Sequence, residues 1–254
     1  MNTAIATRRP YQGVTQILQF NWRMYAGGAA AIGVCWSAAV FLPGAARVAL
    51  WVASAPAAFW LASSLAVSHY VYDRFPLHDL EWLERRLLHG PRRWLNVHSG
   101  WDETSELLAG IFPEAAGQVA DLFDPRVMTE PSIREAHRMN RSTMASVPAS
   151  YDALPFACGA FDAVFAFFSA HELRKHAQRV RLFEEIARIL APEGEFVLVE
   201  HTRDWRNFLA FGPGFLHFFS ERAWRRVARD ASLTVRAEFS MTPFVRVYIL
   251  RRAS

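Results

Sequence analysis

Lysine is almost absent from this chain of 254 residues: Lys175 is the only one, so the net charge of +4 rests on arginine. Nucleic-acid-binding proteins gather basic residues on one face or along one helix. Here the arginine pairs lie beside a hydrophobic segment instead, at Arg8-Arg9, Arg85-Arg86 and Arg92-Arg93. This placement favours lipid headgroups over nucleic acid as a partner.

Cysteine is scarce as well, with Cys35 inside an apolar run and Cys158 far along the chain. The two form no Cys-x-x-Cys pair, which leaves a zinc knuckle or a redox motif without support. A reduced, cytoplasmic compartment is the simpler expectation for a chain with so few thiols.

Two long stretches near the N-terminus lack acidic and basic side chains: residues 24–42, and residues 48–71 apart from His69. Each is long enough to cross a hydrocarbon core of ~30 Å at ~1.5 Å per residue. Both are rich in Ala, Gly and Ser, which let membrane helices approach closely, and Pro56 is expected to kink the second. The sequence predicts a membrane-associated helical hairpin over residues 1–77 and a second domain over residues 78–254.

The charges that flank these runs predict an orientation. Arginines precede the first run and follow the second, whereas only Arg47 lies between them. The positive-inside rule then places both ends, and the second domain, on the cytoplasmic side of the cell inner membrane. Three alternatives stay open: the segment lies on the membrane surface, docks on the second domain as a soluble hairpin, or joins two copies of the chain. A cleaved signal peptide is disfavoured because the first run begins late and a second follows.

From residue 78 onward, strand and helix patterns alternate. Strands are predicted at residues 93–98, 118–122, 161–168, 195–201, 233–239 and 245–251, and helices at residues 78–90, 103–111, 130–139, 177–190 and 221–231. Such alternation predicts an α/β fold, with a mostly parallel sheet covered by helices on both faces. The two final strands, joined by a turn at Thr242-Pro243, predict an antiparallel edge.

A known family is suggested by motifs spread over residues 153–200. In order, these are Leu154-Pro155-Phe156, Phe161-Asp162, Arg188-Ile189-Leu190, Pro192-Glu193-Gly194 and Glu200. The stretch resembles the central half of Rossmann-like S-adenosylmethionine-dependent methyltransferases of the ubiquinone and menaquinone C-methyltransferase type. The resemblance implies a transferase with S-adenosyl-L-methionine as its cofactor.

The loop that should contact this cofactor departs from the family pattern. The family has an acidic residue and a Gly-x-Gly-x-Gly turn, because glycine lets the backbone approach the ligand closely. Here Asn96 stands at the acidic position, His98 and Asp102 replace two glycines, and Gly100 remains. Asp102, Glu103 and Thr104 are expected to cap the next helix and hold the ammonium group of the cofactor. A loop that has lost cofactor binding is the alternative; Gly100→Val should separate the two by abolishing binding while leaving the fold intact.

Further cofactor contacts are implied by the resemblance. Asp121 ends the second strand, where an acid should bridge the ribose hydroxyls, with Asp124 as the alternative. On the adenine side the family register points to Ser150, which leaves Asp152 as the nearest acid. Leu154 and Phe168 complete the predicted cofactor residues.

The predicted catalytic residues follow the next two strands: His171 and Glu172 after one, and His201 after the other. Open α/β sheets bind ligands at the carboxyl ends of their strands, and histidine titrates near neutrality, as a base for methyl transfer should. Each histidine has a structural role as its alternative. No metal is expected, because His171 and His176 are five residues apart and diverge on a helix.

The acceptor is suggested by residues 203–219, which hold six aromatic residues and a Gly-Pro-Gly turn. In related methyltransferases this stretch forms part of the acceptor pocket, and an aromatic wall suits a flat or lipid-like molecule. The sequence therefore predicts methyl transfer to a hydrophobic acceptor at the membrane surface, with a quinone or phenolic lipid precursor ahead of a lipid amine. A binding or scaffold protein that kept the fold is the alternative, and a related cofactor chemistry is a third possibility.

Overall fold

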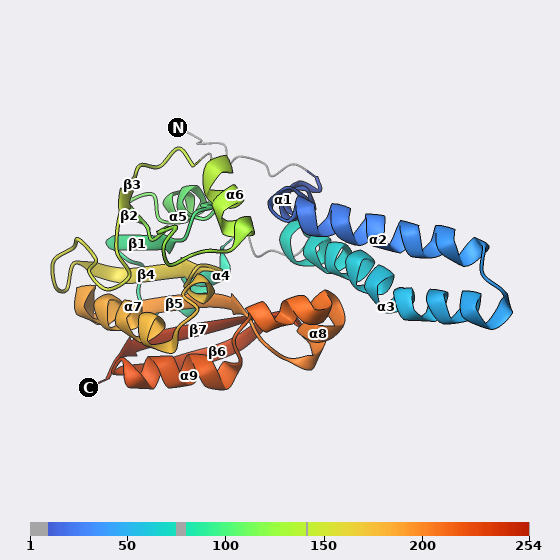
Figure 1. Cartoon of the computed structure of the whole chain (residues 1–254). Helices are drawn as coiled ribbons and strands as arrows, with labels where there is room; N and C mark the ends of the chain where they lie inside the picture. The colour runs from blue at the N-terminus through green and yellow to red at the C-terminus, as the bar shows by residue number, and fades with distance from the viewer. Residues whose placement is uncertain (1–9, 75–79, 141, 254) are drawn as a thin grey trace. The chain divides into compact units, whose positions relative to one another are not determined.

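A computed structural model describes residues 10–74, 80–140 and 142–253 (Figure 1). Within these residues, contacts between Cα atoms define two compact units. The sheet unit contains residues 80–203 and 216–253, and the helical unit contains residues 10–74 and 204–215. The sequence had assigned residues 204–215 to the second domain, so this segment is a departure from the predicted organisation.

The sheet unit is built on seven strands in the order β3-β2-β1-β4-β5-β7-β6. Their bounds are β1 (Arg93–His98), β2 (Ala116–Asp121), β3 (Ser146–Pro148), β4 (Phe161–Phe167), β5 (Leu190–His201), β6 (Leu233–Thr242) and β7 (Val245–Arg252). The first five strands pair in parallel, whereas β7 lies antiparallel between β5 and β6. The predicted Rossmann-like sheet with an antiparallel edge is confirmed.

Helices connect these strands. They are α4 (Trp82–Arg86), α5 (Ser105–Ile111), α6 (Pro131–Met139), α7 (His176–Ile189) and α9 (Glu221–Asp230), with the short 3-10 turns η3 (Ala170–Glu172) and η4 (Gly212–His217). The helix predicted at residues 78–90 is shorter, and its first two residues lie outside the described residues. On one face, α7 and α9 pack together (Figure 1): Phe183 stacks on Trp224 and meets Phe196 of β5 edge-on.

The helical unit contains α1 (Gln12–Phe20), α2 (Trp22–Val40), α3 (Gly44–His69) with the π turn η1 (Tyr70–Arg74), and α8 (Trp205–Phe211). Helix α3 continues through Pro56 without ending there. Arg47, the only charged residue between the two apolar runs, donates hydrogen bonds to the carbonyls of Ala39, Val40 and Leu42 at the end of α2. Its guanidinium therefore adds hydrogen bonds at the end of α2, where the last carbonyls of a helix lack the usual partner four residues on.

Polar side chains join α2 and α3. The indole of Trp36 donates to Ser54 at 3.0 Å, and the hydroxyls of Tyr25 and Ser64 are 3.0 Å apart. Ser54 and Ser64 are both buried. Small residues of this kind let two helices approach closely and bond to each other.

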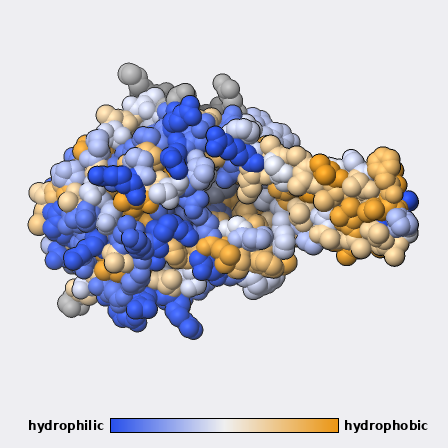
Figure 2. Space-filling view, in the orientation of Figure 1, coloured by the Kyte–Doolittle hydropathy of each residue, from blue (hydrophilic) through white to orange (hydrophobic). Residues whose placement is uncertain are grey.

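The outward surface of the hairpin is apolar (Figure 2). Exposed large hydrophobic residues include Val34, Trp36, Phe41, Trp51, Val52 and Phe59. Among the described helices, only the stretch Gly44–Arg74 has the length and hydropathy of a membrane span, with a mean hydropathy of 1.5. The first predicted run, now α2, falls short of that criterion, so one of the two predicted spans is supported on this measure.

Candidate functional site

The loop after β1 is held together by Asn96, which stands at the position where the family has an acid. Its amide nitrogen donates to the hydroxyls of Thr104 and Ser105 at 2.9 and 2.8 Å, and to Asp102 at 3.2 Å. The Asp102 carboxylate also accepts the backbone N–H groups of Thr104 and Ser105. Asp102 therefore caps the first turn of α5, while the neighbouring Glu103 is half-buried.

Gly100 adopts a φ of 111°, a backbone conformation that only glycine enters readily. A Cβ atom at this position would lie 3.2 Å from Cδ1 of Ile133 and 3.3 Å from both the carbonyl oxygen of Ile133 and Cβ of His137. The expectation that Gly100→Val leaves the fold intact therefore needs correction. A side chain here strains the backbone and presses on α6 whether or not the cofactor binds.

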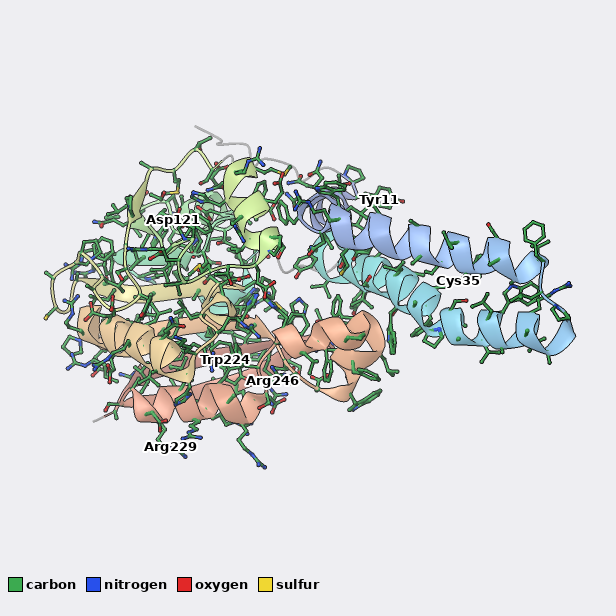
Figure 3. The ribbon with its side chains drawn as sticks, viewed as in Figure 1. Tyr11, Cys35, Asp121, Trp224, Arg229 and Arg246 are labelled. Atoms are coloured by element: carbon green, nitrogen blue, oxygen red, sulfur yellow. The ribbon has the colours of Figure 1, made fainter. Side chains whose placement is uncertain are left out.

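Asp121, labelled in Figure 3, ends β2. It pairs with His98, the last residue of β1. One of its carboxylate oxygens accepts the backbone N–H of Phe123 at 2.9 Å. The Nδ1 atoms of His98 and His137 lie 3.7 and 3.5 Å from the carboxylate, and the ring of His137 stacks on Phe123. Asp121 thus sits at the end of its strand in a polar cluster with two imidazoles.

Several buried polar atoms at this end of the sheet have no hydrogen-bond partner within the described residues: Oδ1 of Asn96, Nε2 of His98 and Nδ1 of His137. Such atoms are costly when unpaired, and in native proteins each one calls for an explanation. They come from β1 and α6, around the residues that the sequence assigned to the cofactor. A polar ligand between these elements would satisfy them.

The remaining predicted cofactor residues have other partners. Asp124 accepts hydrogen bonds from Arg126, which lower its pKa. Asp152 is exposed and bonded to the Ser150 hydroxyl. Leu154 belongs to the hydrophobic core, where its backbone N–H donates to Glu185. These contacts give Asp124 and Leu154 roles in local structure.

His171 lies in η3, directly after β4, between two carboxylates. Its Nδ1 is 2.7 Å from Glu200 and its Nε2 is 3.4 Å from Glu172; all three residues are buried. Burial alone would lower the pKa of His171, but the charge of Glu200 and hydrogen bonds to both carboxylates outweigh it and raise the pKa to about 10. Burial likewise opposes ionisation of Glu172, yet hydrogen bonds from His171 and His217 hold its pKa well below the usual range. At neutral pH this pairing keeps His171 protonated and Glu172 ionised, so Glu172 is the member of the pair that can accept a hydrogen bond from a ligand.

His201, the other predicted base, ends β5 and places its Nδ1 3.0 Å from the carbonyl oxygen of Phe244. Its ring stacks on Phe218 with centroids 4.7 Å apart and lies 5.1 Å from that of Phe168. Phe168 itself has a φ of 49°. These contacts match the structural alternative for His201 more closely than a role as a base.

His217 is a polar member of the site that sequence reasoning missed. Its Nε2 lies 3.6 Å from Glu172, and its ring meets that of His171 edge-on. Arg174 donates to the carbonyl oxygens of both His171 and His217. The sequence had assigned residues 203–219 to the acceptor wall for their aromatic content, and His217 was the titratable residue inside that stretch.

Two hydrogen bonds join the end of β1 and its following loop to Ser169, which precedes the cluster of His171, Glu172 and His217. The Ser169 hydroxyl donates to the carbonyl of Val97 at 2.8 Å, and the Ser99 hydroxyl donates to the carbonyl of Ser169 at 3.1 Å. Ser99 directly precedes Gly100, and Ser169 lies two residues before His171. The predicted cofactor and catalytic residues therefore share one edge of the sheet.

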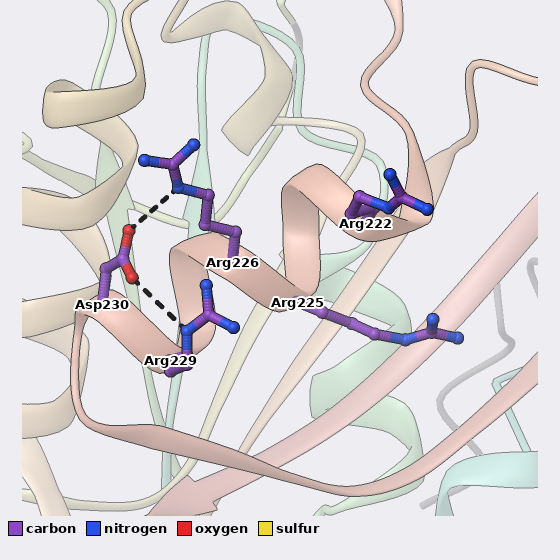
Figure 4. A pocket seen from close by; sticks show the side chains of 5 residues that line it. All are labelled: Arg222, Arg225, Arg226, Arg229 and Asp230. Atoms are coloured by element: carbon purple, nitrogen blue, oxygen red, sulfur yellow. Dashed lines mark ion pairs between the residues drawn. The ribbon is translucent and has the colours of Figure 1, made fainter.

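A separate depression of about 500 Å³ lies on α9 (Figure 4). It is lined by Arg222, Arg225, Arg226, Arg229 and Asp230. Asp230 pairs with Arg226 and Arg229, whereas Arg225 bonds to Glu238. It includes none of the predicted site residues.

Comparison with known proteins identifies the fold. Residues 123–198 match the family described as "Methyltransferase domain". Mitomycin 7-O-methyltransferase MmcR is similar in structure, with a TM-score of 0.55 and 15% identity over 97% of this chain and 74% of that chain. An S-adenosylmethionine-dependent methyltransferase from Aquifex aeolicus is similar too, with a TM-score of 0.51 and 16% identity over 74% and 97% of the two chains. Comparison with curated proteins gives no match.

A further similar structure is geranyl diphosphate C-methyltransferase from Streptomyces coelicolor A3(2), in complex with Mg²⁺, geranyl diphosphate and S-adenosyl-L-homocysteine. Its TM-score is 0.50, with 16% identity over 68% of this chain and 78% of that chain. At these identities the structures share the fold. Together with the family match over residues 123–198, they confirm the predicted Rossmann-like methyltransferase fold.

Proposed function

We propose that the chain transfers a methyl group from S-adenosylmethionine to a hydrophobic acceptor at the cytoplasmic surface of a membrane. The observation that carries the proposal is the bonding of the β1 loop to the end of β4 through Ser99 and Ser169. It joins the residues suited to the cofactor to a buried carboxylate suited to the acceptor. In methyl transfer, positioning of the two reactants supplies much of the rate.

The residues around Asp121 suit the cofactor. The backbone N–H of Phe123 donates to one oxygen of Asp121, and the other oxygen, 3.5 Å from Nδ1 of His137, is the one that we assign to the ribose hydroxyls. The unpaired nitrogen of His98 and the amide oxygen of Asn96 lie on β1, directly before the loop that carries Gly100. When bound, S-adenosylmethionine supplies an electrophilic methyl group on a sulfonium. The protein's own task is to hold this group in line with the acceptor and to exclude water.

Glu172 is the residue we assign to the acceptor. It stays ionised, and its Oε2 is buried without a hydrogen-bond partner in the described part of the chain. A carboxylate in this state accepts a hydrogen bond from a hydroxyl or an amine and orients that group, while its lowered pKa makes it a weak base. His171, held as an imidazolium between two carboxylates, keeps Glu172 in place.

A membrane-bound acceptor is supported by the helical unit. Segment 204–215, which the family resemblance links to the acceptor pocket, packs on α3: Phe208 meets Trp60 edge-on, and Ser63 donates to the carbonyl of Leu209. On α8, Trp205 and Leu209 remain exposed. The chain then reaches His217 of the site a few residues later. An apolar helix pair and an acceptor-side segment built together suit a substrate delivered from lipid.

Asp121→Asn tests the cofactor site. Loss of a charge-assisted hydrogen bond is expected to weaken S-adenosylmethionine binding by about 1–3 kcal/mol, measured by calorimetry on detergent-purified protein. Asp124→Asn, which alters a nearby acid paired with Arg126, should bind like the wild type. A wild-type protein that binds no cofactor, and shows no thermal shift at saturating ligand, would favour the binding or scaffold alternative.

Membrane attachment is tested by fractionation. The full-length chain is expected to sediment with membranes, to resist extraction by high salt and alkaline carbonate, and to dissolve in detergent, because its exposed α2–α3 surface is apolar. Release by salt alone would indicate attachment through the arginines. Recovery in the soluble fraction without detergent would rule out the anchor.

A further inference from the structure

Three side chains of the sheet unit bring one ligand-type atom each to a common point. Nε2 of His171 lies 3.4 Å and Nε2 of His217 lies 3.6 Å from Oε1 of Glu172, and all three atoms are within 4.8 Å of one another. In a tetrahedral zinc site with bonds of about 2.0–2.1 Å, neighbouring ligand atoms are about 3.3 Å apart. Small side-chain shifts would therefore bring the three atoms to coordination distance.

Glu200 fixes the orientation of the His171 ring, as a carboxylate behind a metal-binding histidine usually does. It accepts the backbone N–H of His171 at 3.2 Å, and its other oxygen lies 2.7 Å from Nδ1. Histidines that bind metals usually donate their second ring N–H to a carboxylate or a carbonyl. With Nδ1 donating to Glu200, Nε2 is the atom left to face Glu172, and a metal ion bound there would displace the proton that Nε2 carries in the metal-free protein. Glu200 is fully buried, so this orientation is fixed by packing.

Two further observations point to a ligand at this place. Glu172 is more than nine-tenths buried, yet its Oε2 has no hydrogen-bond partner among the described residues. Arg174 fastens the two ligand-bearing segments by donating to the carbonyls of His171 and His217. The His217 side chain is 28% exposed, which gives an ion a path from solvent.

We propose that His171, Glu172 and His217 bind a divalent transition-metal ion of the zinc type, with Glu200 orienting His171. Two histidines and one carboxylate form a donor set that zinc accepts, and they leave a fourth position for water. Occupation of that position by an acceptor oxygen would rest on the proposed function, whereas metal binding does not. The sequence argument against a metal paired His171 with His176, but His176 bonds to Asp230 and His217 takes its place.

The test uses full-length protein in detergent, stripped with a chelator. It would be titrated with Co²⁺, whose visible absorption reports tetrahedral coordination, and with Zn²⁺ against a chromophoric chelator. We expect one ion per chain. His217→Ala and Glu172→Gln should each weaken Zn²⁺ binding at least about tenfold, and Glu200→Gln about 10- to 100-fold. His176→Ala is the matched control and should bind Zn²⁺ like the wild type.

Circular dichroism melting identifies any variant that fails to fold, and His217→Ala is the decisive one because its side chain is partly exposed. Equal Zn²⁺ affinity in the wild type and His217→Ala, or no stoichiometric binding, overturns the proposal. Calorimetry with S-adenosylmethionine on the same samples keeps the two proposals apart. Protein that binds Zn²⁺ but no cofactor would support the metal site and contradict the proposed function. Protein that binds the cofactor but no Zn²⁺ would support the proposed function and contradict the metal site.

Discussion

Gly117→Ala is expected to destabilise the sheet unit by about 3 kcal/mol, near the upper end for overpacking a core. Gly117 of β2 pairs with Trp94 of β1, and a Cβ atom at this position would overlap the indole ring. The ring cannot move aside, because Trp94 is fully buried and contacts Phe165. For a domain of this size, 3 kcal/mol corresponds to a fall in Tm of roughly 6–12 °C.

Gly90→Ala is the matched control for this substitution. A Cβ atom there would meet nothing within 4 Å, and the residue is exposed. Its effect should stay within about 0.5 kcal/mol, as for most surface changes. Neither glycine has a positive φ, so the comparison isolates packing from backbone strain. Thermal melts followed by circular dichroism give both values, and equal melting of the two variants would contradict the packing of Trp94 on Gly117.

The strands of the sheet were largely predictable because buried strands consist of short runs of hydrophobic residues that can be recognised in the sequence. Residues 93–98 were predicted as a strand and form β1, and the buried run at 161–168 ends one residue earlier as β4. Strand β3 was missed because its three residues are exposed and show no hydrophobic pattern. Helix α8 was missed because its apolar residues were interpreted as a pocket wall, whereas several of them pack on α3.

The candidate site was predictable to the extent that strand ends determine it. Parallel strands bring their carboxyl ends to one edge, so Asp121, His171 and Glu172 could be chosen from the pattern alone. His217 could not, because it comes from a segment whose path depends on tertiary packing. The restriction on Gly100 was also hidden, since it arises from α6, a helix that follows a different strand.

Deleting residues 1–75 is expected to leave a protein that aggregates or stays bound to detergent, although the sequence predicts a separate domain over residues 78–254. The deletion removes α3 from segment 204–215, where Gly212, with a φ of 54°, lies against the ring of Trp60 so closely that a Cβ atom would come within 2.5 Å of it. Loss of α3 increases the exposure of Phe208, which is already partly exposed together with Trp205 and Leu209. A contiguous apolar patch of this kind promotes association.

A second deletion tests that explanation. In the chain lacking residues 1–75, replacing residues 204–215 with a Gly-Ser linker of equal length removes the uncovered patch and should restore a monodisperse, detergent-free protein. Size-exclusion chromatography with light scattering distinguishes the two forms. If both are monodisperse, α8 needs no cover from α3. If both aggregate, the insoluble surface lies elsewhere in the sheet unit. Solubility that returns only with the linker would identify segment 204–215 as part of the apolar anchor, which ends two residues before His217 of the candidate site.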